Sequence, residues 1–345
     1  HDHGLGSVHG LRLRRGDDHG DDVADEAHPV GGQRRPVHGR RQHHEPVDRR
    51  KVEVGGRVDG GHARHRHRLR GVDRGDDGRA KPAEPAPQTA AALPDSHREE
   101  YRPHVIDKPG SWLIISDIHT PYHDRVTLEL AAREAKRRNV VGIILNGDTL
   151  DSHEISRHDK EPGAPRYVEE VATCRKLLGW LRGQFPRARM VLKEGNHEER
   201  LGAYIVQRAP ALFGLEGVNI PALLHLDDIG AEWITGRRVI QLGRLNVIHG
   251  HEFPGGANPP VNPARGLYLK ARSVAICGHH HQTSEHHARN IRGRAEAAWS
   301  LGCACFLYPR YMPLNNWNHG FAFVEVDGGG EFAVDNKRVF SGRIV

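Results

Sequence analysis

The sequence predicts an α/β fold after about residue 105, preceded by a segment that cannot form a core. Two observations support this. None of the first 100 residues is Phe, Tyr or Trp, and short apolar runs alternate with helical patterns after residue 105. The 345 residues leave room for one large domain with a tail, or for two domains. We expect one folded domain over residues 106–345.

The N-terminal segment, residues 1–105, is rich in His, Arg and Gly and has no helical or strand period. Such a composition buries too little apolar surface to offset the entropy of ordering the chain, so we predict disorder. Residues 81–87 read as an extended linker into the folded part. Two interpretations of the segment stay open: a genuine tail, or GC-rich DNA translated upstream of the true start or out of frame. The second arises because the sequence begins with His and not Met.

Five short apolar runs predict buried strands, and two regions between them predict helices. The helical patterns cover residues 126–138 and the region around residues 174–181. Two alternating runs, 321–326 and 331–340, flank a glycine turn and predict a closing hairpin. The five buried strands are expected at residues 112–116, 140–145, 190–193, 245–248 and 273–277.

The amino-acid composition gives only broad information about the cellular compartment and the binding partners. The formal net charge of +6 weakly favours anionic partners. Four cysteines are too few for a disulfide framework, so we expect a reducing compartment, with Cys303 and Cys305 as buried thiols. No run approaches the roughly 18 apolar residues of a membrane helix, and no signal-peptide core occurs near the start. These features predict a cytoplasmic protein with no membrane partner.

Each predicted strand runs directly into a polar loop rich in Asp, Asn, His and Gly. In α/β folds the loops at the carboxyl ends of strands hold ligands. Their carboxylates, imidazoles and one amide oxygen suit two divalent transition metals, and a metal pair is what phosphate ester cleavage needs. A single fragment is a weak signal, but the joint order is specific. The loops are Asp117-Ile118-His119, Gly147-Asp148-Thr149-Leu150-Asp151, Gly195-Asn196-His197-Glu198, His249-Gly250-His251 and Gly278-His279-His280-His281.

In this order and spacing, residues 110–285 resemble the calcineurin-like metallophosphoesterase family. The resemblance implies a metallophosphoesterase-type four-layer α/β/β/α sandwich of two mixed sheets, with a dinuclear metal centre at the strand ends. It also implies a hydrolase, either a phosphatase or a phosphodiesterase, that uses two divalent ions such as Mn, Fe or Zn.

The resemblance also implies individual roles, position by position. The residues of the D-x-H motif, Asp117 and His119, would bind the first metal together with His281. Asp148 would bridge both metals. The second metal would take Asn196, His249 and His279.

The same resemblance assigns the chemistry. His197 would be the proton donor to the leaving group, while a hydroxide bridging the metals attacks phosphorus in line. Glu198 would orient its neighbours from outside the ligand set. Asp151 is expected to order its loop, with direct catalysis as the alternative.

Several further residues have two interpretations. Arg200 suits a phosphate contact, because guanidinium forks match phosphate, or is a solvated arginine at a helix start. His251 is expected to face the substrate or to be structural, and alternation should turn His280 away from its neighbours. Other residues near the loops could read the substrate, namely His123, Arg157 and His158. Three residues near the end are expected to pack the core rather than form a nucleobase platform, namely Trp317, His319 and Phe321.

We therefore expect a metal-dependent phosphoesterase that acts on a phosphate ester. Nucleotides and nucleic acids are candidate substrates. A catalytically inactive binding scaffold of the same fold is the alternative. It is disfavoured because a degenerate site usually lacks one or more ligands, whereas all are present here. A His-rich metal-storage protein is a third interpretation, which predicts many metals per chain.

Overall fold

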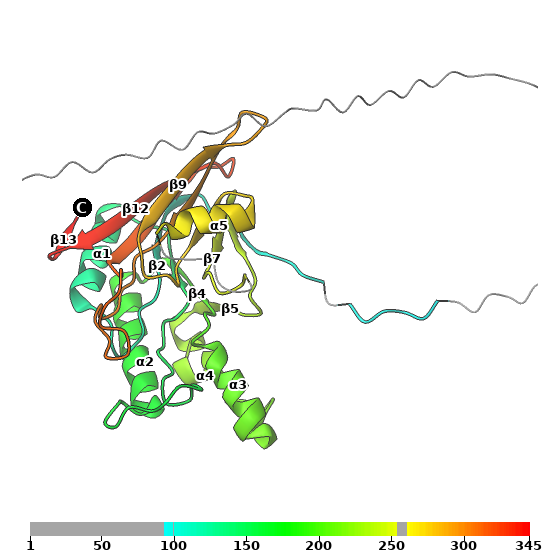
Figure 1. The fold of residues 1–345 in the computed structure, drawn as a ribbon, viewed down its shortest axis with the longest axis vertical. Coiled ribbons are helices and arrows are strands. Elements are labelled where there is room, and N and C mark those ends of the chain that lie inside the picture. The colour runs from blue at the N-terminus through cyan, green and yellow to red at the C-terminus, as the bar shows by residue number, and fades with distance from the viewer. Residues whose placement is uncertain (1–92, 99, 254–260) are drawn as a thin grey trace, which may run out of the picture. The chain divides into compact units, whose positions relative to one another are not determined.

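The computed structural model describes residues 93–98, 100–253 and 261–345 (Figure 1). The predicted segment 1–105 and the linker at residues 81–87 therefore lie mostly or wholly outside the described residues. The end of that segment belongs to the fold, however. The backbone N–H of Val239 donates to the hydroxyl of Tyr101 over 2.9 Å, and the first strand begins at His104.

A seven-stranded mixed sheet contains three of the predicted strands and the predicted closing hairpin. Its central strands are parallel to one another, whereas β11 pairs antiparallel with both β2 and β12. The carboxyl ends of the parallel strands therefore meet at one edge of the sheet. In order across the sheet the strands are β13 (Arg343–Ile344), β12 (Phe332–Phe340), β11 (His319–Val326), β2 (Gly110–Ile115), β3 (Gly142–Asn146), β4 (Arg189–Lys193) and β5 (Ala231–Ile234).

A second, six-stranded mixed sheet contains the other two predicted strands. Strands β7 and β8 are parallel, as are β8 and β10, while the β6–β7 and β9–β10 pairs are antiparallel. In order the strands are β1 (His104–Ile106), β6 (Ile240–Leu242), β7 (Leu245–Ile248), β8 (Ala275–Cys277), β10 (Ala295–Ser300) and β9 (Ser284–Arg289).

The two sheets pack face to face, and helices cover both outer faces (Figure 1). Buried residues of both sheets share one apolar cluster, with Ile114 and Ile144 from one sheet and Val247 and Ile276 from the other. The helices α1 (Arg125–Arg137) and α2 (Tyr167–Gln184) contribute to the core on the far side of the seven-stranded sheet. Helix α5 (Pro263–Ala271) covers the six-stranded sheet through Leu267. The predicted four-layer α/β/β/α sandwich is therefore confirmed.

Helix α1 shows how local sequence sets these layers. The side chain of Asp124 caps it by accepting from the backbone N–H of Thr127 over 2.7 Å. Lys136 and Arg137 in the last turn oppose the negative end of the helix dipole. Leu128 and Ala135 point into the core. The observed helix lies within one residue of the predicted one.

The predicted strands and hairpin are also confirmed, with boundaries shifted by up to two residues. Elements not predicted include β5 and β6, which are short, and β9, which is half-exposed. Strand β10 was not predicted either, although its last four residues are buried. The remaining helices are α3 (Glu199–Arg208), α4 (Ile220–Leu224) and two 3₁₀ turns, Pro210–Leu212 and Asp227–Ile229.

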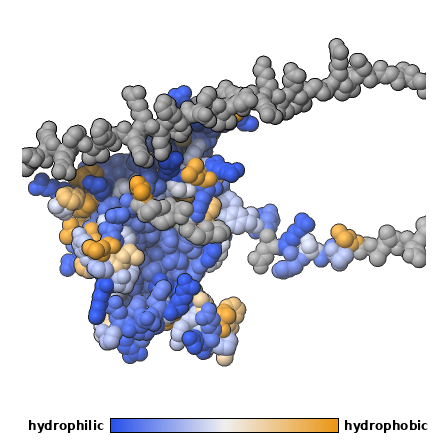
Figure 2. All heavy atoms as spheres, viewed as in Figure 1, coloured by the Kyte–Doolittle hydropathy of each residue, from blue (hydrophilic) through white to orange (hydrophobic). Residues whose placement is uncertain are grey.

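On the face drawn in Figure 2, hydrophilic residues predominate and apolar residues occur in small separate groups. None of the helices in the described part of the chain is long and apolar enough to cross a membrane.

Within the seven-stranded sheet, β2 and β3 pack closely at Gly142, which pairs with Trp112. A Cβ atom at Gly142 would lie 2.2 Å from the buried Trp112 ring. We predict that Gly142→Ala lowers the free energy of unfolding by about 1–3 kcal/mol, as overpacking of a core does. Urea unfolding followed by tryptophan fluorescence measures this.

The matched control is Gly179→Ala in α2, where an added Cβ meets nothing within 4 Å. There we expect unchanged stability or a gain of up to about 1 kcal/mol, because alanine favours a helix. Equal effects of the two substitutions would show that the ring contact does not limit packing.

Candidate metal centre

The five polar loops converge at the carboxyl ends of strands from both sheets. Loops after β2, β3 and β4 come from the seven-stranded sheet, and loops after β7 and β8 come from the six-stranded sheet. Because the sheets pack face to face with these ends together, side chains up to about 160 residues apart in the chain come into contact, such as those of His119 and His281. The site therefore depends on the packing of the two sheets against each other.

The first group of ligand atoms gathers around Asp117. Single ligand atoms of Asp117, His119 and Asp148 all lie within 4.8 Å of one another. The Nε2 atom of His281 lies 3.2 Å from Oδ1 of Asp117 and 3.2 Å from Nε2 of His119. The structure thus brings together the four side chains expected at the first metal.

A second group shares Asp148 with the first. Ligand atoms of Asp148, His249 and His279 lie within 4.8 Å of one another. The Nε2 atom of His249 lies 3.2 Å from Oδ2 of Asp148 and 3.2 Å from the amide oxygen of Asn196. Asp148 therefore occupies the place that a carboxylate shared by two cations requires.

The carboxylates of this cluster are buried, and the electrostatics follow from that. Asp117 is 0% and Asp148 is 1% exposed. Burial alone would raise the pKa of Asp148, but the surrounding His197 and His249 outweigh it and hold that pKa well below its usual range. Burial would lower the pKa of His249, but Asp148 outweighs it and raises the pKa to about 10. Without cations, protonated imidazoles thus offset the buried carboxylates.

His281 behaves as His249 does, while His279 does not. Burial lowers the pKa of an imidazole, but at His281 the carboxylate of Asp117 outweighs this and raises the pKa to about 10. At His279 burial dominates, and His249 adds to it, so the pKa falls to about 3. An imidazolium cannot bind a metal, so protons and cations compete for His249 and His281.

The backbone of the predicted ligands adopts an uncommon conformation. Most non-glycine residues avoid the left-handed region, although Asp, Asn and His enter it more often than others. Such strain persists where the surrounding structure enforces it, and it gathers at functional sites. Five predicted ligands have positive φ angles: Asp117 (56°), His119 (47°), Asp148 (52°), His279 (67°) and His281 (55°).

Partners outside the ligand set orient the imidazoles. Nδ1 of His119 lies 3.1 Å from Oδ1 of Asp151, and Nδ1 of His249 lies 2.8 Å from the carbonyl oxygen of Asn146. Each contact engages Nδ1 and leaves Nε2 facing the cluster. The ordering role predicted for Asp151 thus corresponds to an interaction with His119.

Glu198 joins two of the loops through their backbones. Its buried carboxylate accepts from the N–H groups of Asp148, Thr149, Leu150 and Gly195, over 2.7 to 3.0 Å. Burial, and then the nearby Asp148, raise the pKa of Glu198 to about 7. Glycine is required at position 195, because a Cβ there would lie 2.3 Å from Oδ1 of Asp148.

Glu252, which the sequence did not single out, plays the same part for the loop after β7. Its carboxylate accepts from the N–H groups of His249 (2.8 Å) and Gly250 (2.6 Å). The fully buried Lys193 lies 3.0 Å away. Burial would raise the pKa of Glu252, but Lys193 and then His249 outweigh it and lower the pKa to about 2. Glu252 is therefore a charged residue that positions His249.

His197 lies at the edge of the cluster with both ring nitrogens engaged. Its backbone N–H donates to Oδ1 of Asp148 over 2.9 Å, and Nδ1 lies 2.6 Å from the carbonyl oxygen of Asp151. Nε2 lies 3.7 Å from Oδ2 of Asp148. Arg200 donates to this Nε2 over 2.8 Å and to the Asp151 carbonyl over 2.7 Å. Arg200 thus lies in the site and is not a solvated arginine.

His251 and His280 lie beside the ligands but belong to none of the ligand groups described above. Nε2 of His251 lies 2.9 Å from Glu199, and only 7% of the side chain is exposed. This favours the structural interpretation of His251. The ring of His280 lies against that of His279, with centroids 5.2 Å apart.

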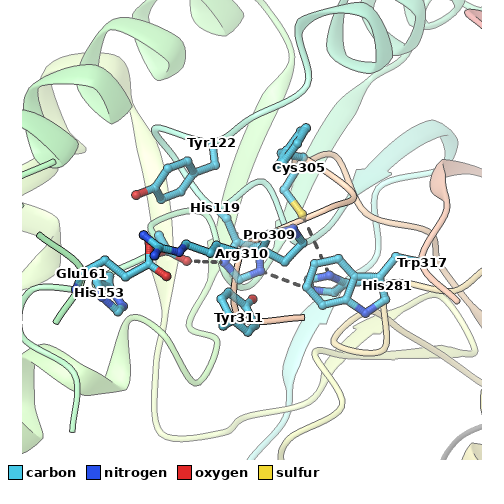
Figure 3. A pocket seen from close by; sticks show the side chains of 12 residues that line it. His119, Tyr122, His153, Glu161, His281, Cys305, Pro309, Arg310, Tyr311 and Trp317 are labelled. Carbon is cyan, nitrogen blue, oxygen red and sulfur yellow. Dashed lines mark hydrogen bonds and ion pairs between the residues drawn. The ribbon is translucent and has the colours of Figure 1, made fainter. Parts of the chain in front are cut away.

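Other candidates fall into three places. His123 pairs with Cys305 in an isolated antiparallel β-bridge. Arg157 and His158 are exposed. Phe321 is fully buried in the core, as predicted. Trp317 instead lines a cavity beside His119 and His281, which the sequence did not reveal (Figure 3).

Glu198 offers a test of how the loops are held. Glu198→Ala leaves four buried N–H groups unpaired, so we predict a loss of at least about 3 kcal/mol in the free energy of unfolding. We also expect weaker metal binding. Chemical denaturation and calorimetric Mn²⁺ titration measure the two effects.

The control is Glu129→Ala in α1, where an exposed carboxylate forms a surface pair with Arg125. This substitution should change stability by about 0.5 kcal/mol or less. If Glu198→Ala were as mild as this control, the loops would be held by other contacts.

No family model matches the chain. The Gene 54 protein of Mycobacterium phage L5 is 28% identical over 250 residues, covering 65% of this chain and 96% of that protein.

Solved structures match at low identity. Vps29 from Entamoeba histolytica complexed with Zn²⁺ is 14% identical, with a TM-score of 0.35, covering 68% of this chain and 96% of that one. YfcE, a phosphoesterase from E. coli, is 13% identical, with a TM-score of 0.29, covering 65% and 98%. The fold assignment rests on the sheet order and layers described above. The resemblance to calcineurin-like metallophosphoesterases thus extends from the motifs to the layered architecture that it implies.

Proposed function

We propose that this chain is a metal-dependent phosphoesterase of the calcineurin-like kind, which hydrolyses phosphomonoester or phosphodiester bonds. The observation that carries the proposal is the shared position of Asp148. It belongs to both groups of ligand atoms, and His197 lies directly beside it. A structural cluster of histidines would need neither the shared carboxylate nor the adjacent imidazole.

The side chains fit two divalent cations. Two carboxylates are almost fully buried and accompanied by imidazoles whose Nε2 atoms face them, a donor set that Mn, Fe and Zn accept. Such ions neutralise phosphoryl oxygens and make water nucleophilic at neutral pH. We assign Asp117, His119, Asp148 and His281 to one ion, and Asp148, Asn196, His249 and His279 to the other.

The chain's own residues would supply the remaining chemistry. The carbonyl of Asp151 accepts from Nδ1–H of His197, so Nε2 is the atom that would take up a proton from solvent, once the Arg200 guanidinium turns away, and then give it to the leaving-group oxygen. Arg200 contacts that same Nε2. Its guanidinium can turn to hold a phosphoryl oxygen of the substrate. We leave His251 out of the substrate contacts because Glu199 engages it.

The same proposal places the protein in a reducing compartment such as the cytoplasm. All four cysteines lie in the described part of the chain, and each is a buried, free thiol.

The direct test is a panel assay of the full chain with Mn²⁺, Fe²⁺ or Zn²⁺. Substrates should include aryl phosphate monoesters and diesters, cyclic nucleotides, and single- and double-stranded DNA and RNA. Hydrolysis of any class, abolished by chelation and restored by metal, supports the proposal. Bound metals without turnover on the whole panel would instead indicate the inactive scaffold.

We predict that His197→Ala keeps both metals yet loses about 10²- to 10⁴-fold in kcat on esters with poor leaving groups. The loss should be smaller for nitrophenolate, which leaves without protonation. Elemental analysis and steady-state kinetics measure the two properties. His287→Ala, at an exposed position of β9, is the matched control. Full activity of His197→Ala on an alkyl ester would remove His197 from the mechanism.

Asp148→Asn tests the shared ligand. We predict loss of both metals on dialysis and lower stability, because the substitution removes the carboxylate nearest to the buried His249. Metal content by elemental analysis and thermal unfolding measure these effects. Asp335→Asn, which alters a contact of Arg138 away from the cluster, should keep the full metal content. Two metals still bound to Asp148→Asn would contradict the shared assignment.

A further inference from the structure

A cavity of about 270 Å³ opens beside the metal centre (Figure 3). One wall consists of His119, Asp151 and His281, which belong to the cluster or orient it. Six of the other lining residues lie between residues 305 and 317, within the segment that joins β10 to β11. A phosphate bound at the cluster would therefore have its ester group next to this cavity.

Aromatic rings make up much of the cavity lining outside the metal cluster. Four rings line the cavity, those of Tyr122, Phe306, Tyr311 and Trp317. Three of them are unusually exposed for aromatic residues, with Tyr122 at 41%, Phe306 at 54% and Tyr311 at 68%. Exposed rings that line one cavity offer apolar faces on which a planar group can stack.

Trp317 contacts both a residue of the metal cluster and another ring of the cavity. Its ring packs on the imidazole of His281 with centroids 4.0 Å apart, and the ring of Tyr311 lies 6.4 Å from it. The sequence predicted a packing role for Trp317. Trp317 does pack against a neighbouring ring, but it also lines the cavity.

Polar groups complete the lining and narrow the class of ligand. Glu161 and Arg310 place a carboxylate and a guanidinium in the cavity wall, so hydrogen-bond acceptors and donors are both at hand. A planar ring with amino and carbonyl groups at its edge uses both the faces and these polar groups, as nucleobases do. A sugar or an aliphatic chain can contact the ring faces, but it has no planar aromatic face to stack on them. The volume lies just under the range of about 300–1,000 Å³ typical of whole-ligand sites, which suits one ring system.

We propose that this cavity binds the nucleobase of a nucleotide whose phosphate lies at the metal centre. The inference rests on the proposed function for the position of the phosphate. It names the substrate class, a nucleoside phosphate ester, and assigns base stacking to Tyr311 together with Trp317.

The test compares two ligands that differ only in the base. One is the phosphonate analogue of adenosine 5′-monophosphate, with CH₂ in place of the bridging oxygen so that it is not hydrolysed, and the other is the same phosphonate of ribose. Calorimetric titration of the full, Mn²⁺-loaded chain measures both. Base stacking contributes about 1–3 kcal/mol, so the nucleoside analogue should bind about 5- to 150-fold more tightly.

Tyr311→Ala should reduce this ratio several-fold, while Tyr308→Ala should leave it unchanged. Tyr308 is the matched control, because it is similarly exposed on the same segment but does not line the cavity. Equal affinities for the two ligands in the wild-type chain, or an unchanged ratio in Tyr311→Ala, would overturn the inference. The readout needs no turnover. Absent hydrolysis would therefore sink the proposed function alone, and a flat binding ratio in an active enzyme would sink the cavity assignment alone.

Discussion

The buried carboxylate of Asp148 is the constraint on which the rest of the site depends. An unpaired carboxylate in a protein interior costs several kcal/mol, so its neighbours must supply positive charge or hydrogen bonds. Asp148 receives the backbone N–H of His197 and lies 3.2 Å from His249, whose pKa is raised to about 10. Protons and divalent cations can both offset its charge. Metal loading, protonation and stability of this domain are therefore linked.

The ligand loops could not take this arrangement without support from outside the ligand set. Left-handed backbone at Asp117, Asp148 and His281 is unfavourable in isolation. Two buried carboxylates stabilise the loops by accepting backbone N–H groups, Glu198 after β3 and β4 and Glu252 after β7. The two differ in charge balance. Lys193 pairs with Glu252. At Glu198, burial and then the nearby Asp148 raise the pKa to about 7, although the backbone N–H groups that donate to it lower it.

The sequence predicted those parts of the fold and site that local pattern determines. Buried strands read as continuous apolar runs, and the loops that follow them carry recognisable ligand spacing, so the residues that converge were named in advance. Strand β9 lacks such a pattern because it is half-exposed, and β10 lacks it because its apolar run covers only residues 297–299. Contacts between distant segments were also out of reach. Nothing local at Glu252 indicates that Lys193, 59 positions earlier, will neutralise it, and nothing at Trp317 indicates that it packs on His281.

The path of the chain places the exposed rings of Phe306 and Tyr311 on a different segment from the predicted metal ligands. Strand β10 belongs to the six-stranded sheet and β11 to the seven-stranded sheet, so the segment between them passes from one sheet to the other. Six residues of this segment, between 305 and 317, line the cavity. Glu198 and Glu252 hold the ligand loops. The ends of the segment also contact these loops, since the N–H of Ala304 donates to the carbonyl of Asp117 and the N–H of Asn318 donates to the carbonyl of His281. Trp317 adds a side-chain contact between the two, because its ring packs on His281. Substitutions at exposed ring positions such as Tyr311 should therefore alter which ester is bound while leaving the metal ligands in place.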